Sequence, residues 1–140
     1  MSTITKTVTV PARLDQTWDA IRDIGALHRQ LVPGFVKATE IETDGESIIR
    51  VVTFGNGMVV REPILSCDDE AMRLAWTVEE GRTSHYNGSV QVFADQSGGS
   101  RIVWIVDFLP ASMAPMIDGA MTAGAASMRK ALGALAESTT

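Results

Sequence analysis

Three large aromatic residues with polar atoms lie in runs of alternating side chains that are typical of strands. Trp76, Tyr86 and Trp104 each occupy the apolar side of such a run. A buried phenol or indole needs a hydrogen-bond partner, so these residues would bring donors as well as apolar surface to one interior. Gly88 follows Tyr86 on the same side, and we expect it to leave room there. The simpler interpretation is that the three aromatic residues only fill a core.

Two charged residues have the chemistry of a site, but the local pattern does not decide which way they point. Lys37 lies in the run 35–42 and Glu62 in the run 58–66, and both runs carry apolar residues on both sides. Inside an apolar cavity each charge would be costly unless it were paired or used on a ligand. Outside, both would be ordinary surface charges. If they point inward, Glu62 or Tyr86 has the chemistry of a general acid or base.

Familiar catalytic and cofactor motifs are absent from the sequence. We find no HExxH, no GxGxxG, no Walker sequence and no Ser-His-Asp order. The single cysteine, Cys67, excludes a disulfide within the chain and a zinc site built on cysteines. The sequence therefore predicts no metal and no cofactor.

Composition narrows the class of protein. Of the 140 residues, 45% are hydrophobic and 21% are charged, which is typical of one globular domain spanning residues 1–140. The net charge is −5 with no basic cluster, which argues against nucleic acid as a partner. No apolar run has transmembrane length, and the N-terminus lacks the apolar core of a signal peptide. We expect a cytoplasmic protein without membrane insertion.

The order of elements indicates an α+β fold. Helical patterns are predicted at 15–23, 26–31 and 112–136. Strands are predicted at 3–10, 35–42, 47–54, 58–66, 72–79, 84–94 and 101–109. The strands from residue 35 onward are joined by short turns, so neighbours should pair antiparallel. A sheet of about seven strands must curl around the one long helix, and the space left between them would form a pocket.

The long C-terminal helix is rich in small and flexible side chains. Its expected inner face contains Gly and Ala, which take up little space, and methionine, which adapts its shape. This composition favours a helix that covers a cavity receiving an apolar molecule. The other interpretation is a close-packing surface against the sheet or a second subunit, a homodimer being one arrangement. The residues proposed to line the cavity from this helix are Ala120, Met121, Gly124 and Met128.

Four segments together resemble one known superfamily. They are residues 12–23 after the first strand, residues 60–70, Tyr86–Ser89, and residues 104–110 before the long helix. In this order and spacing the chain resembles the helix-grip superfamily, also called START-like or SRPBCC, which includes polyketide cyclase/dehydrase-like proteins. The resemblance implies a curled antiparallel sheet around a long C-terminal helix, with two short helical pieces after the first strand.

The resemblance also implies candidate site residues. Plant hormone receptors of this superfamily use a pocket lysine, a glutamate in a middle strand and a tyrosine in a late strand; these correspond to Lys37, Glu62 and Tyr86 here. Members bind lipids, steroids, hormones or polyketides, some catalyse, and some act on protein partners.

The sequence therefore supports one main hypothesis and two alternatives. The main hypothesis is binding, with or without transformation, of a small hydrophobic or aromatic molecule between the sheet and the C-terminal helix. One alternative is a polyketide cyclase or dehydratase with Glu62 and Tyr86 as acid and base. The other is a protein-interaction module whose pocket is collapsed. The expected lining residues are Lys37, Glu62, Trp76, Tyr86, Gly88, Trp104, Ala120, Met121, Gly124 and Met128.

Overall fold

The computed structural model describes residues 2–79 and 81–138. The predicted turn at Glu80 and the two ends of the predicted domain, Met1 and residues 139–140, lie outside the described residues. The strands are β1 (Ser2–Val10), β2 (Val36–Asp44), β3 (Ser47–Phe54), β4 (Val59–Asp68), β5 (Arg73–Thr77), β6 (His85–Ala94) and β7 (Ser100–Leu109). The helices are α1 (Leu14–Arg22), α2 (Ala114–Ser138) and the short pieces η1 (Ile24–Ala26), η2 (Leu27–Leu31) and η3 (Ala111–Met113).

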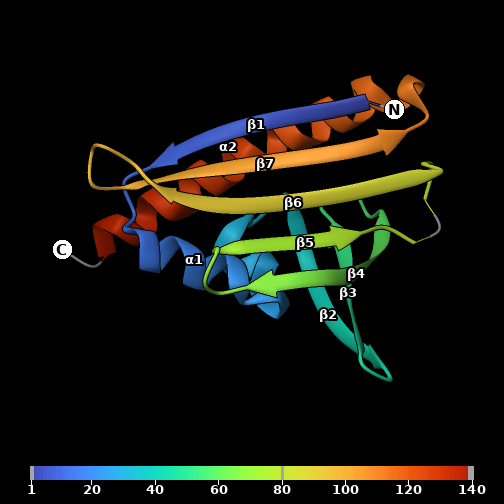
Figure 1. Ribbon diagram of the computed structural model, residues 1–140, viewed down its shortest axis with the longest axis horizontal. Helices are drawn as coiled ribbons and strands as arrows, with labels where there is room; N and C mark the ends of the chain where they lie inside the picture. Colours follow the sequence, from blue (N-terminus) through green and yellow to red (C-terminus); the bar gives the residue numbers. More distant parts are fainter. Residues whose placement is uncertain (1, 80, 139–140) are drawn as a thin grey trace.

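The seven strands form one antiparallel sheet in the order β1-β7-β6-β5-β4-β3-β2. Strands β2 to β7 follow one another with short connections, which is why each pairs with its neighbour in sequence. The helical pieces α1, η1 and η2 connect β1 to the opposite edge of the sheet, and α2 runs behind β1 and β7 (Figure 1). The predicted α+β helix-grip architecture is confirmed.

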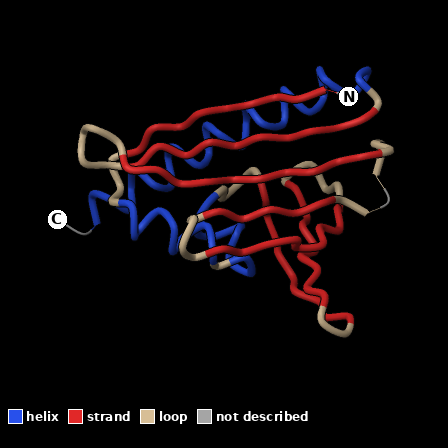
Figure 2. Tube along the Cα trace, viewed as in Figure 1, coloured by secondary structure: helices blue, strands red, loops and turns tan. Residues whose placement is uncertain are grey.

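The sheet bends sharply at β4. The first half of this strand, Val59–Pro63, pairs with β3, whereas the second half, Ile64–Asp68, pairs with β5. A register shift lies between Ile64 and Ser66, and a bulge of this kind bends a strand and increases its twist. As a result β2 and β3 run steeply across the direction of β6 and β7 (Figures 1 and 2). The bend leaves space on the inner face of the sheet.

The alternation in the late strands is confirmed. In β7 the side chains of Ile102, Val106 and Phe108 are fully buried and alternate with partly or fully exposed ones. The structure also decides the direction that the sequence left open in β4. Glu62 is buried on the inner face, and Arg61 points outward, where it pairs with carboxylates from β2 and beyond β5.

Helix α2 begins at Ala114, two residues later than predicted, because residues 111–113 form the separate turn η3. Its buried face is turned slightly from the expected one: Ala120 is exposed, and the neighbouring Met121 is buried. Strand β5 is shorter than the predicted run because Met72 adopts a positive φ of 52° in the preceding turn. Among the described residues, no helix combines the length and apolarity needed to cross a membrane.

Candidate functional site

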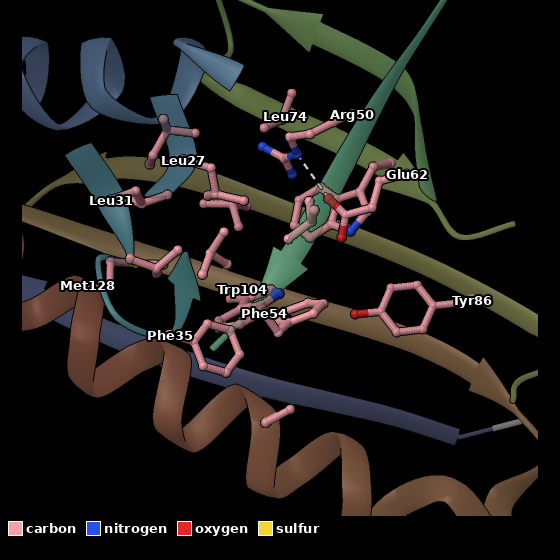
Figure 3. Close-up of a pocket in the computed structure, with 17 residues that line it drawn as sticks. Leu27, Leu31, Phe35, Arg50, Phe54, Glu62, Leu74, Tyr86, Trp104 and Met128 are labelled. Atoms are coloured by element: carbon pink, nitrogen blue, oxygen red, sulfur yellow. Dashed lines mark hydrogen bonds and ion pairs between the residues drawn. The ribbon is translucent and has the colours of Figure 1, made fainter. Parts of the chain in front are cut away.

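A cavity of about 110 Å³ lies where the curled sheet, η2 and α2 meet. Most of its wall is apolar, with contributions from η2, β3, β5, β6, β7 and α2 (Figure 3). The cavity is not filled by side chains, so the structure does not have the collapsed pocket that an interaction module would favour. Its lining residues are Ile21, Leu27, Leu31, Val32, Phe35, Val36, Arg50, Val52, Phe54, Glu62, Leu74, Trp76, Tyr86, Val90, Trp104, Ala120 and Met128.

One buried ion pair supplies the charge of this cavity. Arg50 on β3 and Glu62 on β4 face each other directly across the antiparallel pair, and Arg50 Nε donates to Glu62 Oε1 at 2.9 Å. The two side chains are only 3% and 10% exposed. Among the described residues that line the cavity, no other side chain carries a charge. Burying either charge without the other would cost several kcal/mol, on the order of 3–5, so the pair forms one unit.

The electrostatics of the pocket disfavour ionised acids. Burial raises the pKa of Glu62, and the adjacent Arg50 guanidinium opposes this only in part. Burial also raises the pKa of the Tyr86 phenol well above its ordinary value, and the negative charge of Glu62 adds to this shift. The Tyr86 hydroxyl is directed into the pocket, towards the side where Phe54 and Trp104 lie (Figure 3). Tyr86 is therefore a neutral hydroxyl donor or acceptor over the physiological pH range.

Trp76 is held in place by close neighbours on β3 and β6. The Arg50 guanidinium carbon lies 5.5 Å from the centroid of the indole ring, a cation–π contact. A Cβ built on Gly88, the cross-strand partner of Trp76, would lie 2.7 Å from its Cε2 atom. Gly88 thus does not leave a void as expected; the space beside it holds the Trp76 ring.

Trp104 is fixed in a similar way against α2. A Cβ built on Gly124 would lie 2.9 Å from Trp104 Cη2 and 3.2 Å from Phe35 Cε2. This glycine allows the helix to approach the ring closely, so it acts in packing rather than in opening the pocket. The small residues of α2 therefore serve a tight contact at Gly124 and an open mouth at Ala120, one turn away.

The cavity continues into a second hollow of about 160 Å³ towards the surface. The two share Phe54, Glu62, Tyr86 and Ala120. The outer hollow is bordered by Met58 on one side and by residues 81–83 and Met116 on the other. A third, more open hollow of about 310 Å³ also borders Phe54 and Ala120. These two residues therefore stand between the buried cavity and solvent.

Four of the expected lining residues do not border the cavity, and Lys37 is the clearest correction. It is exposed, because it occupies the extra position of a β-bulge between Val36 and Ala38 and points away from the inner face. Met121 is buried in the packed contact of α2 rather than at the cavity. The residues predicted for the cavity but absent from its lining are Lys37, Gly88, Met121 and Gly124. Those that the structure does bring together there are Glu62, Trp76, Tyr86, Trp104, Ala120 and Met128.

Sequence reasoning assigned no site role to Arg50, apart from a possible pairing with Glu62, and none to Phe35 or Phe54. A usable signal was present for Arg50: a hairpin centred on Asn56 places Arg50 opposite Glu62, and the observed register has this pairing. Phe35 and Phe54 pack edge to face with ring centroids 5.3 Å apart, and no local pattern indicates this contact between a turn and a strand end. Among the described residues, no group of three or more His, Cys, Asp and Glu side chains could hold a metal ion.

Several solved structures share this architecture. The protein XoxI from Bacillus cereus superposes with a TM-score of 0.82 at 16% identity, over 94% of this chain and 96% of that one. The Zhui aromatase/cyclase from Streptomyces sp. R1128 gives 0.76 at 17% identity, over 97% and 93%. Norcoclaurine synthase from Thalictrum flavum, in complex with dopamine and hydroxybenzaldehyde, gives 0.74 at 21% identity, over 99% and 88%. At these identities the likeness shows the fold alone.

Sequence comparison gives the family directly. No curated protein matches the chain significantly by sequence. Residues 1–138, however, match the family described as polyketide cyclase / dehydrase and lipid transport. This match spans nearly the whole chain and agrees with the fold and with the internal cavity. The chain belongs to the polyketide cyclase / dehydrase and lipid transport family.

Proposed function

We propose that this protein binds a small, largely apolar molecule in the cavity between the inner face of the sheet and α2. The observation that carries this proposal is the cavity itself, which is lined by aromatic and aliphatic side chains and joined to an outer hollow at Ala120. The family description and the aromatic ligands of norcoclaurine synthase support the same conclusion. An apolar cavity with a few polar groups at defined places is typical of small-molecule sites.

The size of the cavity limits the ligand. An apolar cavity of about 150 Å³ is large enough to bind benzene. The inner cavity of about 110 Å³ is somewhat smaller, but the adjoining hollow of about 160 Å³ extends it past Phe54. A molecule of one or two fused rings would occupy both parts. A long acyl chain would have to reach out through the mouth at Ala120.

The mouth offers a clean test of this proposal. Ala120 is exposed and borders all three hollows, so Ala120→Trp should fill the entrance without disturbing the core. The control is Ala123→Trp, an equally exposed position on α2 that borders none of these hollows. We would titrate each protein with indane and with 1-indanone and follow tryptophan fluorescence and calorimetric heat.

The proposal predicts saturable one-to-one binding of at least one of the two compounds to the parent protein and to Ala123→Trp. Binding to Ala120→Trp should be at least tenfold weaker. Equal loss in both variants, or no binding of either compound to the parent, would show that this cavity is not a ligand site.

A second candidate function is proton transfer on the bound molecule. It is favoured by one observation: Glu62, whose pKa is raised by burial, faces the same cavity as the neutral Tyr86 hydroxyl. An acid with a raised pKa is a better base once ionised, and a nearby hydroxyl donor can stabilise a developing oxyanion. In this scheme Glu62 takes a proton from the carbon beside a carbonyl, and the electron pair moves to the oxygen.

The test uses exchange rather than an assumed product. In D₂O, 1-indanone should lose its two protons beside the carbonyl faster with the protein than in buffer alone, as followed by proton NMR. Glu62→Gln should abolish the acceleration while 1-indanone still binds. Exchange at the buffer rate in the presence of saturated protein would remove the enzyme candidate and leave the binding proposal standing.

A further inference from the structure

Two buried indole N–H groups at the cavity have no hydrogen-bond partner among the described residues. They are Nε1 of Trp76 and Nε1 of Trp104, and both side chains line the cavity. The third tryptophan, Trp18, is different, because its Nε1 donates to Asp69 Oδ1 at 2.9 Å. Buried donors are nearly always satisfied in folded proteins, so two open ones on one cavity wall call for a reason.

The two rings are not free to turn towards partners elsewhere. Gly88 and the Arg50 guanidinium pack against Trp76, and Gly124 packs against the Trp104 ring. The close contacts at both glycines mean that each ring fills the space that its neighbours allow. The open donors are therefore a fixed feature of the cavity wall.

The charge of the cavity limits the ligand further. Arg50 and Glu62 cancel each other in a pair only 2.9 Å apart. A ligand with a net charge would enter a low-dielectric space without a free counter-ion, which is strongly unfavourable. A neutral ligand meets no such penalty.

From these observations we infer that the ligand is an uncharged ring compound with carbonyl-type acceptor oxygen, which receives hydrogen bonds from the indole N–H groups of Trp76 and Trp104. This inference rests on the proposed function, because it specifies the chemistry of the molecule bound in the same cavity. An oxygen with two lone pairs can accept from one or both indoles. The apolar walls would enclose the rest of the ring system.

A matched set of four probes tests the ligand chemistry. They share one bicyclic skeleton: 1-indanone carries a carbonyl, indane carries no polar group, 1-aminoindane is a cation at pH 7, and indane-1-carboxylate is an anion. We expect 1-indanone to bind about fivefold more tightly than indane, the gain of one net hydrogen bond. Both charged probes should bind at least tenfold more weakly than 1-indanone.

The indole resonances show directly which donors are used. The chain has three tryptophans, so a ¹⁵N-labelled sample gives three indole N–H signals. Saturation with 1-indanone should move the signals of Trp76 and Trp104 downfield and leave that of Trp18, already bonded to Asp69, almost unchanged. Trp104→Phe, which keeps a ring but removes the donor, should weaken 1-indanone binding about three- to fivefold and leave indane binding unaltered. Trp76→Phe provides a second, independent variant if Trp104→Phe does not fold.

The outcomes separate this inference from the proposed function. If indane binds as tightly as 1-indanone, or a charged probe binds best, the inference is overturned and the cavity is still a ligand site. Unmoved Trp76 and Trp104 signals under saturation would overturn it in the same way. If none of the four probes binds, the proposed function fails and the inference fails with it.

Discussion

The two ends of the inner sheet face differ in how they are filled. On the side of β1, β7 and α2, apolar side chains such as Val8, Ile102 and Leu132 are fully buried, and Gly124 lets the helix touch Trp104. On the side of β3 and β4, the same face carries an ion pair and a cavity. The first region is close-packed and the second keeps polar groups and open volume beyond the bend of β4. The comparison teaches that α2 holds the fold together at one end and borders the site at the other.

The largest effect should come from breaking the ion pair on the open side. Arg50→Met leaves the Glu62 carboxylate buried without a partner, and we expect a loss of about 3–5 kcal/mol in the free energy of unfolding. Arg50→Met combined with Glu62→Met removes both charges and should lose far less, or gain stability. Urea denaturation of the two variants and of Glu62→Met completes the cycle.

The exposed network of Arg61 is the control for that prediction. Arg61 pairs with Glu42 and Glu79 on the outer face, so Arg61→Met should cost much less than Arg50→Met. Losses at Arg50 and Glu62 that simply add in the double variant would mean that the two side chains do not act as one buried unit.

A smaller effect should mark the close-packed side. Gly124→Leu places a side chain where even a Cβ lies 2.9 Å from Trp104, and we expect a loss of about 1–3 kcal/mol. Gly119, also within α2, has open space around its Cβ position. Replacing Gly119 by Ala should raise stability by about 0.5–1 kcal/mol, since alanine is the better helix former.

Thermal denaturation of the two glycine variants measures this contrast. A Gly124→Leu protein as stable as the parent would show that α2 does not pack closely there. It would restore the expectation, drawn from the sequence, that this position opens onto the cavity.

The smallest effect concerns the single tyrosine. The pKa of Tyr86 is raised in the folded protein, so above a pH of about 10 the unfolded chain loses the phenolic proton while the folded one keeps it. Stability should therefore fall as the pH rises past this value, and Tyr86→Phe should remove that part of the decline. Absorbance at 295 nm reports on this residue alone; ionisation near pH 10 without unfolding would contradict the burial of the hydroxyl.

How far the sequence predicts this molecule depends on whether a feature is local. The seven strands and the inward set Trp76, Tyr86 and Trp104 follow from alternation and short turns, and the structure has them. The resemblance, and not the pattern, pointed to Glu62 as an inward residue. Lys37 failed because a bulge shifts it out of the simple alternation, and such an insertion leaves no local sign.

The glycines show the second limit. From the sequence, Gly88 and Gly124 were expected to leave space, but in the structure large indole rings occupy it. A glycine removes volume at its own position, and only the neighbouring side chains determine whether a void remains. Pairing across strands was the missing information, since Trp76 is the partner of Gly88.

The most direct test of the central claim follows the methionine methyl groups by NMR. Met128 lines the inner cavity, whereas Met121 is buried in the packed contact of α2 and borders none of the hollows. With ¹³C-labelled methionine methyls, titration with 1-indanone should shift the Met128 signal saturably at one-to-one stoichiometry and leave Met121 nearly in place. If Met128 does not respond, or Met121 responds as strongly, the cavity between the sheet and α2 is not where this protein binds its ligand.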